Sequence, residues 1–268
     1  MTIESLTVEA GSGKNGVADA IPSFTLKMGD VISIVGPTGS GKTTLINDIE
    51  LFANRNTPSM RRVLINGAVP PEELTGDPSK NPIALITQHT NFLSDLEVGR
   101  FLALHARIRQ SGDPDELVRG TIEFANQLTG EPVEPGIGMT ELSGGQTRAL
   151  LIADAVVIGN SPIILLDEIE NAGIHRTRAL ELLRQYRKIF IFVTHDPRIS
   201  LLSDYRVVMK NGAIQKVITT HDEELIVARE ISRMDDIILF FRKQIRNGER
   251  LTERMFKECL EAFGTPVK

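Results

Sequence analysis

A glycine-rich segment at residues 36–43 carries the clearest chemical pattern of the sequence. It reads GPTGSGKT, which matches G-x-x-x-x-G-K-[ST], and it lies between an apolar run and a segment with helical spacing. Glycines allow the backbone to wrap closely around phosphate groups, and the backbone amides and the helix N-terminus then face the negative charge. We expect Lys42 to reach the β- and γ-phosphates of a nucleotide, Thr43 to offer its hydroxyl to Mg²⁺, and Thr44 to donate to a phosphate. The predicted phosphate-binding residues are Gly36, Pro37, Thr38, Gly39, Ser40, Gly41, Lys42, Thr43 and Thr44.

Two carboxylates follow an apolar run at residues 163–166, where the sequence reads IILLDE. Ligands lie at the carboxyl ends of the strands in a parallel sheet, so this pair is a candidate for a metal and water site. We expect Asp167 to hold Mg²⁺, directly or through water, and Glu168 to polarise an attacking water. The alternative interpretation is an acidic pair at a helix N-terminus, which the helix dipole favours. The phosphate-binding pattern in the same chain favours the metal and water site.

Four apolar runs are expected to position these groups as strands. None of them alternates polar and apolar residues, which is typical of strands covered on both faces in a parallel sheet. The four runs span residues 31–35, 83–87, 163–166 and 189–193. Shorter strands are expected at 6–9, 24–26 and 62–65, and a terminal hairpin at 207–209 and 214–218 around Asn211-Gly212. These runs predict an α/β fold with a mainly parallel sheet.

Helical spacing of apolar residues occupies most of the chain between the strands. The expected helices span 43–52, 93–128 with a break at 111–114, 144–158 and 177–186, while 70–81 is expected to be a surface loop. The last fifty residues are helical in pattern as well. A capping box of Thr220 and Glu223 opens a long helix, Asn247-Gly248 ends it, and a second helix starts near Thr252. We therefore expect one domain at 1–218, with a helical part at about 90–158, and a C-terminal helical hairpin at 219–268.

Composition excludes several classes of protein. The chain has 268 residues, of which 41% are hydrophobic and 24% charged, and its net charge is −5. An acidic balance does not fit a general nucleic-acid binder. Cys259 is the one cysteine, so neither a disulfide framework nor a cysteine-rich metal site is available. The N-terminus does not resemble a signal peptide, and no apolar run approaches the ~20 residues of a membrane helix.

A third motif, LSGGQ at residues 142–146, completes a known combination. On its own it could be a turn that caps a helix, because Ser143 is a good N-cap residue. Together with the phosphate loop and the acidic pair, it makes the sequence resemble the ABC (ATP-binding cassette) ATPases. In that family this helix N-terminus binds the γ-phosphate held by the other subunit, so Ser143, Gly144, Gly145 and Gln146 are expected to bind ATP in trans. The resemblance thus implies a head-to-tail dimer.

The resemblance covers roughly residues 1–218 and implies two more site residues. Gln88 matches the Q-loop glutamine, which senses Mg²⁺ and leads into the helical subdomain, and His195 matches the switch histidine that contacts the γ-phosphate. The other four histidines, His89, His105, His175 and His221, are interpreted as surface or packing residues. The implied fold is a P-loop NTPase of the ABC type. It has a mainly parallel core, an N-terminal antiparallel β subdomain, an inserted helical subdomain and a C-terminal helical extension.

The sequence departs from the family pattern at several places, three of which are as follows. No Phe, Tyr or Trp precedes Pro22, so the aromatic residue that usually stacks on adenine is missing and the preference for ATP over GTP is open. Ile174 stands where the D-loop aspartate is expected, which bears on coupling between the two ATP sites. Asp154 replaces the usual arginine in the helix after the signature.

The expected reaction is hydrolysis of Mg-ATP to ADP and phosphate, with Glu168, His195 and Gln88 as the catalytic residues and Thr43, Gln88 and Asp167 as the metal site. The partner is a second copy or a paralogue. Three roles remain open: the cytoplasmic ATP-binding subunit of a membrane transporter, a soluble ATPase in metallocofactor assembly or enzyme activation, and a regulatory module with little turnover. In the first role a permease docks at the helical subdomain and holds the chain at the inner face of the membrane; in the second the partner is a soluble client protein. No nucleic-acid partner is expected.

Overall fold

The computed structural model describes residues 2–76, 80–109, 112–168 and 176–263. The chain forms two compact units, Met1–Thr219 and Thr220–Lys268. Ile174 and the other D-loop positions, together with His175, lie outside the described residues. Among those described, no helix combines the length and the apolar character needed to span a membrane.

A six-stranded sheet forms the centre of the first unit, in the order β5-β6-β7-β3-β8-β9. Its strands are β3 (Val31–Val35), β5 (Ile83–Ile86), β6 (Ile163–Asp167), β7 (Ile189–Val193), β8 (Tyr205–Lys210) and β9 (Ala213–Thr219). All neighbours are parallel except β8 and β9, which form an antiparallel hairpin. The prediction of a parallel sheet from the four apolar runs is confirmed. Since Ile34 and Asp167 both pair with Val193, the ends of β3, β6 and β7 reach the same edge of the sheet.

A smaller antiparallel sheet lies at the N-terminal side, in the order β2-β1-β4. Its strands are β1 (Ser5–Glu9), β2 (Ser23–Lys27) and β4 (Arg62–Ile65). Alternate residues such as Leu6 and Val8 point inwards, which is the pattern of a sheet with one buried face. They join one apolar core with Leu45 and Ile49 of helix α1 (Lys42–Glu50) and with one face of the large sheet. Helix α1 therefore packs in the layer that separates the two sheets.

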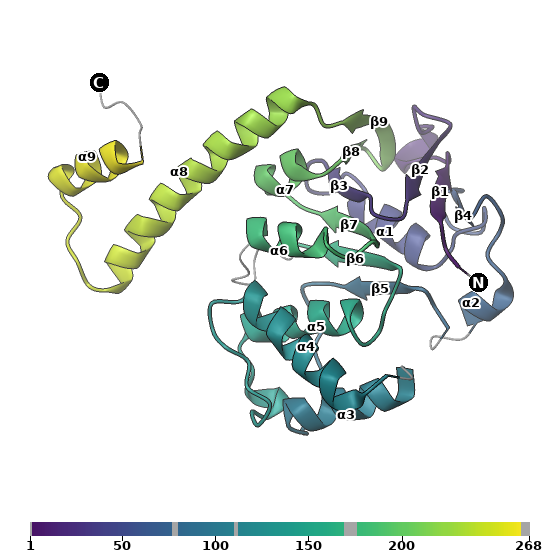
Figure 1. Cartoon of the computed structure of the whole chain (residues 1–268). Coiled ribbons are helices and arrows are strands. Elements are labelled where there is room, and N and C mark those ends of the chain that lie inside the picture. The colour runs from purple at the N-terminus through teal and green to yellow at the C-terminus, as the bar shows by residue number, and fades with distance from the viewer. Residues whose placement is uncertain (1, 77–79, 110–111, 169–175, 264–268) are drawn as a thin grey trace. The chain divides into compact units, whose positions relative to one another are not determined.

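Helices cover the other face of the large sheet. They are α3 (Val98–Arg109), α4 (Pro114–Leu128), α5 (Gly144–Val156), α6 (Arg176–Leu183) and α7 (Pro197–Leu202). Figure 1 shows α3, α4 and α5 together beside the edge strand β5. A second apolar core joins residues of these helices, such as Leu102, Phe124 and Leu150, to Leu166 and Phe192 of the sheet. The two cores give the first unit three layers: antiparallel sheet with α1, large sheet, and helices.

Two local predictions need correction, and three short elements have no counterpart among the predictions. The predicted loop at 70–81 contains a short helix, α2 (Glu72–Gly76), and the helix expected from residue 93 begins at Val98. Helix α7 was not predicted, although Asp196 caps it and Pro197 opens it. Two 3₁₀ turns, at Lys14–Gly16 and Met139–Glu141, were also not predicted.

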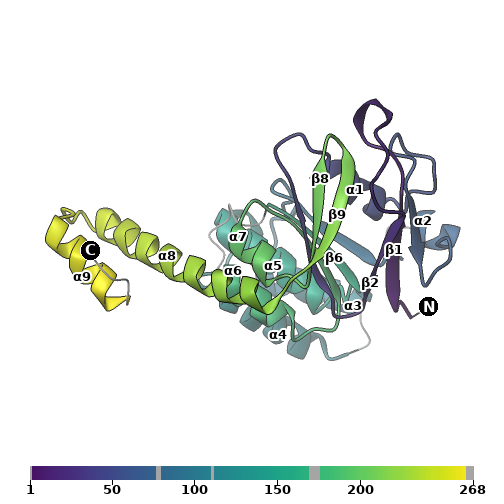
Figure 2. The ribbon, with the colours of Figure 1, turned by 90° about the horizontal axis from the view of Figure 1, so that it is seen from above.

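The second unit consists of α8 (Asp222–Arg246) and α9 (Glu253–Ala262). Figure 2 shows α8 as one continuous helix followed by a turn into α9. The N-cap of α8 is His221, whose amide donates to Glu224 Oε2 at 3.3 Å, so the predicted box of Thr220 and Glu223 is displaced by one residue. Gly248 ends the helix with a φ of 80°, as a C-terminal glycine commonly does.

Candidate functional site

The phosphate loop connects β3 to α1 in a conformation that only glycine tolerates at two positions. Gly41 has a φ of 98°, and a Cβ there would lie 2.7 Å from Gly212 Cα in the turn between β8 and β9. A Cβ on Gly36 would lie 2.4 Å from the carbonyl oxygen of Met209. The amide of Gly212 also donates to Ser40 O at 2.8 Å. The β8–β9 turn therefore forms the wall against which the phosphate loop is packed.

Lys42 lies over this loop with its ammonium group close to the predicted switch histidine. Its Nζ donates to Gly36 O at 2.9 Å and lies 3.2 Å from His195 Nε2. The side chain is buried in the described structure. An ammonium group held beside the backbone of the phosphate loop is suited to binding phosphate oxygens.

The Glu168 carboxylate, directly after β6, lies beside the same histidine. Glu168 follows Asp167 with a φ of 50°, and its amide donates to Val193 O at 3.0 Å. Its Oε1 lies 3.9 Å from His195 Nε2. The positive φ turns the chain sharply at the strand end, where side chains reach a ligand. Lys42 at the start of α1, Glu168 after β6 and His195 after β7 thus meet at one place.

The turn that presents His195 is built by its neighbours. The amide of Asp196 donates to Thr194 Oγ1 at 2.8 Å, and the Asp196 carboxylate caps α7 by accepting from Arg198 N at 2.8 Å. The same carboxylate forms a 2.8 Å ion pair with the Arg198 guanidinium. Because Thr194 and Asp196 are buried, the backbone on both sides of His195 is fixed.

A single cleft of about 410 Å³ brings most predicted site residues together. The predicted residues that line it are Thr38, Gly39, Ser40, Gly41, Lys42, Thr43, Thr44, Gln88, Asp167, Glu168 and His195. Gly36 and Pro37 lie at the start of the loop and contribute carbonyl groups that accept from Lys42. The phosphate loop, the acidic pair, the Q-loop glutamine and the switch histidine therefore share one site.

Four residues of the cleft were not predicted: Lys14, Thr87, His89 and Val193. His89 is exposed, in agreement with its interpretation as a surface residue, and its place directly after Gln88 puts it at the cleft. Lys14 donates from Nζ to Gly39 O at 3.1 Å and so contacts the phosphate loop from the N-terminal loop. No sequence pattern distinguishes Lys14, because the contact joins residues 25 positions apart.

The oxygen donors of the cleft fit a magnesium ion. Thr43, Asp167 and Gln88 all line the cleft, and they offer a hydroxyl, a carboxylate and an amide oxygen. In the described parts of the chain, no three His, Cys, Asp or Glu side chains cluster as a metal site. Magnesium bound together with a nucleotide needs few protein ligands, because phosphate oxygens and waters complete its octahedron.

The signature segment lies away from this cleft, at the start of α5. Ser143 caps the helix by accepting from Gln146 N at 3.3 Å, and Gln146 Oε1 accepts from Ser143 N at 2.9 Å. This confirms the capping geometry. Ser143 and Gly144 are exposed, and no residue of the signature lines the cleft. The amides of Gly144 and Gly145 have no acceptor among the described residues.

Arg148 and Asp154 connect the signature helix to the Q-loop and to α3. Arg148 donates from Nη2 to the carbonyl oxygen of Gln88, which joins the Q-loop directly to α5. Asp154 Oδ1 lies 2.8 Å from His105 Nδ1, so the residue that replaces the usual arginine bonds α5 to α3. His105 is thus a packing residue with a specific partner.

A buried ionic cluster supports α1 behind the phosphate loop. Arg61 is fully buried, and its guanidinium lies 2.8 Å from Asp19 and 3.2 Å from Asp48 of α1. It also donates to Gly212 O at 2.8 Å. Burial raises the pKa of Asp19, but hydrogen bonds from Arg61 and from the amides of Gly11 and Ile214 outweigh it and hold the pKa below its ordinary value. The cluster joins the N-terminal loop, α1 and the β8–β9 turn.

Comparison with known proteins gives three similarities. Residues 20–171 match the sequence model of the ABC transporter family. The chain is 48% identical over 252 residues to an uncharacterized ABC transporter ATP-binding protein of Methanocaldococcus jannaschii, covering 94% of this chain and 96% of that protein. It is 35% identical over 188 residues to the β-(1→2)glucan export ATP-binding/permease protein NdvA of Agrobacterium vitis, covering 66% of this chain and 30% of that protein.

Comparison with solved structures shows that the fold resembles that of ATP-binding cassettes. A dimeric post-hydrolysis state of an ATP-binding cassette bound to ADP and Pi superposes with a TM-score of 0.60 at 22% identity. The match covers 81% of this chain and 99% of that one. At this identity the likeness bears on the fold alone, and it agrees with the P-loop architecture expected from the motifs.

Proposed function

This chain belongs to the ABC transporter family and is an ATP hydrolase of that family, and from that premise we propose that it acts as a head-to-tail dimer on Mg-ATP and serves as the ATP-binding subunit of a membrane transporter. The dimer is inferred from one observation: the two halves of the expected ATP site are separated within one copy. One half-site is the cleft at Lys42, and the other is the helix N-terminus at the exposed Gly144 and the half-buried Gly145. Neither can complete the other within one copy, because the signature does not line the cleft.

The residues of the cleft suit the hydrolysis of a phosphoanhydride. Lys42 and the loop amides would stabilise negative charge on the transferring phosphoryl group, and Gly144 and Gly145 of the other copy would add amide donors at the γ-phosphate. Glu168 would accept a hydrogen bond from the water that attacks the γ-phosphorus as its bond to the bridging oxygen breaks. His195, held between Lys42 and Glu168, would contact the γ-phosphate.

Magnesium would be held by Thr43 and Asp167, with Gln88 in reach, and would neutralise phosphate charge. The Gln88 carbonyl accepts from Arg148 of the signature helix. A movement of Gln88 on nucleotide binding is therefore transmitted to α5. This gives the ATP site a direct route to the helical subdomain, at about residues 90–158, where a permease would dock.

The role in transport rests on the named relatives. One is an ABC transporter ATP-binding protein that this chain matches over nearly its whole length, and the other joins an ATP-binding domain to a permease. We infer that the chain lies on the cytoplasmic side of the membrane and is held there by its partner. In this proposal residues 1–218 are the ATPase domain and residues 219–268 an extension.

Trapping the dimer tests the closure by ATP. Glu168→Gln should retain ATP binding but stop hydrolysis, so that ATP shifts the protein to a closed dimer that size-exclusion chromatography resolves from the ADP-bound form. Lys42→Ala should abolish tight ATP binding, whereas Lys27→Ala on the exposed face of β2 should leave it unchanged. An ATP-bound Glu168→Gln protein that elutes like the ADP form would contradict the proposal.

Complementation tests the arrangement in trans. Lys42→Ala removes one half-site and Gly144→Asp the other, and each variant alone should be inactive. An equimolar mixture should regain about a quarter of the wild-type rate, because half of the dimers are mixed and each retains one of two sites. A mixture as inactive as its components would contradict the head-to-tail arrangement.

Capture from native membranes tests the transport role. The tagged chain should bring down an integral membrane protein from a detergent extract. Recovery of a soluble client and no membrane protein would contradict transport while leaving the ATPase assignment intact.

A further inference from the structure

Helix α8 carries an apolar stripe that its own unit leaves exposed. The stripe, called here the α8 stripe, consists of four side chains with exposed fractions of 49%, 63%, 47% and 60%: Val227, Met234, Ile238 and Ile245. In the described part of this unit, the buried residues are Ala228, Ile237 and Cys259. Two helices that bury so few side chains do not supply a core for themselves. The α8 stripe therefore requires a partner surface.

The spacing of the α8 stripe is that of a seam between two helices. Its members are seven, four and seven positions apart, and the half-buried Ile231 and Phe241 fill the gaps. Apolar residues thus recur in steps of four and three along a helix of 25 residues. This repeat keeps one seam of a helix turned towards a second helix over several turns.

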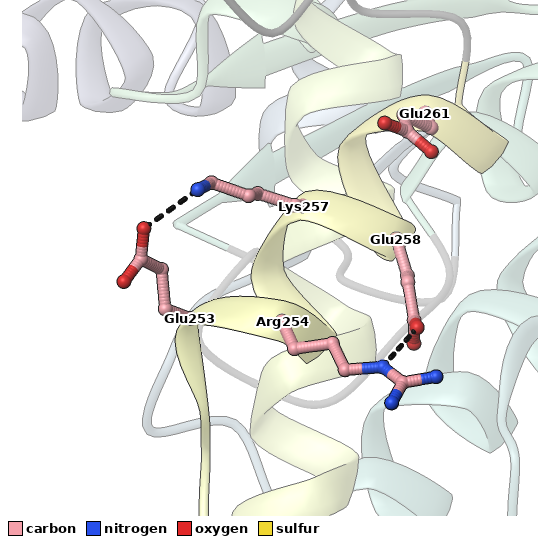
Figure 3. Close-up of a pocket in the computed structure, with 5 residues that line it drawn as sticks. All are labelled: Glu253, Arg254, Lys257, Glu258 and Glu261. Carbon is pink, nitrogen blue, oxygen red and sulfur yellow. Dashed lines mark hydrogen bonds and ion pairs between the residues drawn. The ribbon is translucent and has the colours of Figure 1, made fainter.

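Helix α9 does not provide that second helix. It contacts α8 through Phe256, whose ring stacks on Phe241 with centroids 5.7 Å apart, and the α8 stripe stays exposed beside this contact. Figure 3 shows the charged side chains of α9, which form two ion pairs of 2.7 Å: Lys257–Glu253 and Arg254–Glu258. Such pairs are typical of a helix face in water.

The charges of α8 indicate what covers the α8 stripe. Residues 222–236 contain six acidic and two basic residues, whereas 237–246 contain three basic and no acidic residue. The acids extend to Asp235 and Asp236, beyond the first turn in which the helix dipole favours them. A helix that is acidic in one half and basic in the other is complementary to a second copy of itself in the antiparallel direction.

We propose that two copies of the chain pair through the α8 stripe, with their α8 helices antiparallel. Val227 of one copy then lies beside Ile245 of the other, and Met234 lies beside Ile238, so that the apolar seam is continuous. The pairing uses no nucleotide. It keeps two ATPase domains together when ATP hydrolysis opens the closed dimer, and it goes beyond the proposed function, which requires contact between the copies only in the ATP-bound state.

The first test is the mass of the full chain without nucleotide. Size-exclusion chromatography with light scattering should show a dimer at micromolar concentration. Met234→Glu combined with Ile238→Glu should raise the dimer Kd by about 100-fold, since each change forfeits an apolar contact and adds like charge across the seam. The matched control is Leu251→Glu, at a residue that is 45% exposed but outside the α8 stripe. A wild-type monomer, or a double variant that stays as dimeric as the control, would overturn the proposal.

The second test determines the direction. In a Cys259→Ser background, Val227→Cys or Ile245→Cys alone should not form a disulfide between copies, whereas a mixture of the two variants should. Disulfides in each single variant and none in the mixture would indicate parallel helices and overturn the proposal.

The two proposals fail separately. Adding Glu168→Gln to the double variant should restore dimers with ATP, which shows that the chain is folded and that only the α8 contact is lost. If the nucleotide-free dimer forms but ATP causes no closure in Glu168→Gln, the head-to-tail proposal fails and the α8 pairing stands.

Discussion

Replacing Arg61 by methionine removes the guanidinium that two buried carboxylates share. The methionine keeps an unbranched apolar chain, so the change mainly deletes the charge and its hydrogen bonds. Asp19 then loses the guanidinium nitrogen at 2.8 Å and Asp48 the one at 3.2 Å. Both carboxylates stay buried, like Arg61 in the wild type. Removing one partner of a buried ionic group costs about 3–5 kcal/mol, because the remaining charge is left uncompensated.

That cost converts to a large change in thermal stability. For a domain of this size, 1 kcal/mol shifts the Tm by about 2–4 °C, so Arg61→Met should lower it by about 6–20 °C. Affinity for ATP should fall as well, since Asp48 belongs to α1 and Arg61 also holds Gly212 against the phosphate loop.

Thermal unfolding followed by circular dichroism at pH 7 measures the effect, with ligand-free protein at one concentration. The matched control is Arg62→Met, one residue along the chain. Arg62 is 40% exposed and lies 3.5 Å from Glu9, so its removal should cost less than about 1 kcal/mol.

The pH dependence adds a second signature. The pKa of Asp19 is lower in the folded chain than its ordinary value of 3.8, so the native state binds this proton less readily than the unfolded chain. The stability that it contributes is present above that value and is lost as the pH falls through the folded pKa. In Arg61→Met the Asp19 carboxyl protonates more readily because its cationic partner is gone, so the deficit should shrink from pH 7 to pH 4. A variant that unfolds within 2 °C of Arg62→Met at pH 7, or a deficit that grows in acid, would refute this account of the cluster.

Two further changes test other parts of the fold. Burial lowers the pKa of Lys188 from 10.5 to about 8, so the folded chain releases this proton at a lower pH than the unfolded chain. Between pH 8 and 10.5 the unfolding free energy of the wild type should therefore rise by about 3 kcal/mol relative to that of Lys188→Met. Urea unfolding measures this difference, and a difference that does not change with pH would contradict the assignment. Gly212→Ala would place a Cβ 2.7 Å from Lys14 N at a φ of 80°, whereas the control Gly248→Ala has the same φ and no atom within 4 Å of its Cβ. Gly212→Ala should therefore lose about 1–3 kcal/mol more unfolding free energy than the control, and it should bind ATP more weakly in a titration. Equal losses in the two variants would show that the turn does not support the phosphate loop.

The strands could be predicted from the sequence because each is a local apolar run. Residues 31–35 and 189–193 have the predicted bounds, and all but the half-buried Val35 are buried because layers cover both faces of the sheet. The order of the strands could not be predicted in this way. β3 pairs with β7 and β8, which follow it by more than 150 residues, and no local pattern records such a pairing.

Short helices and helix starts were the weaker predictions. Helix α7 has six residues, too few for an apolar period, although Asp196 followed by Pro197 is itself a helix-start signal. At α8 both Thr220 and His221 precede an acidic residue by three positions. Because residues 222–224 are all acidic, Glu223 could cap Thr220 or Glu224 could cap His221. The pattern therefore does not determine at which residue α8 begins.

The site was predictable where its residues are contiguous. The phosphate loop and the acidic pair are short motifs that the fold brings to one sheet edge. Lys14 and Arg61 act through residues 25 and 42 positions away, and in the sequence they look like ordinary surface cations. Contacts of that kind are found only when the chain is folded.

The position of β3 also has a consequence for the design of fragments. The family match ends at residue 171, but both neighbours of β3 and the turn that backs the phosphate loop come later in the chain. A fragment cut at the end of that match would retain the GPTGSGKT motif after an unpaired strand. It would lack both the β8–β9 turn that packs against the phosphate loop and His195. A fragment designed to hold a nucleotide should therefore extend to the end of β9 at Thr219, and expression of isolated motif regions is expected to yield unfolded, non-binding protein.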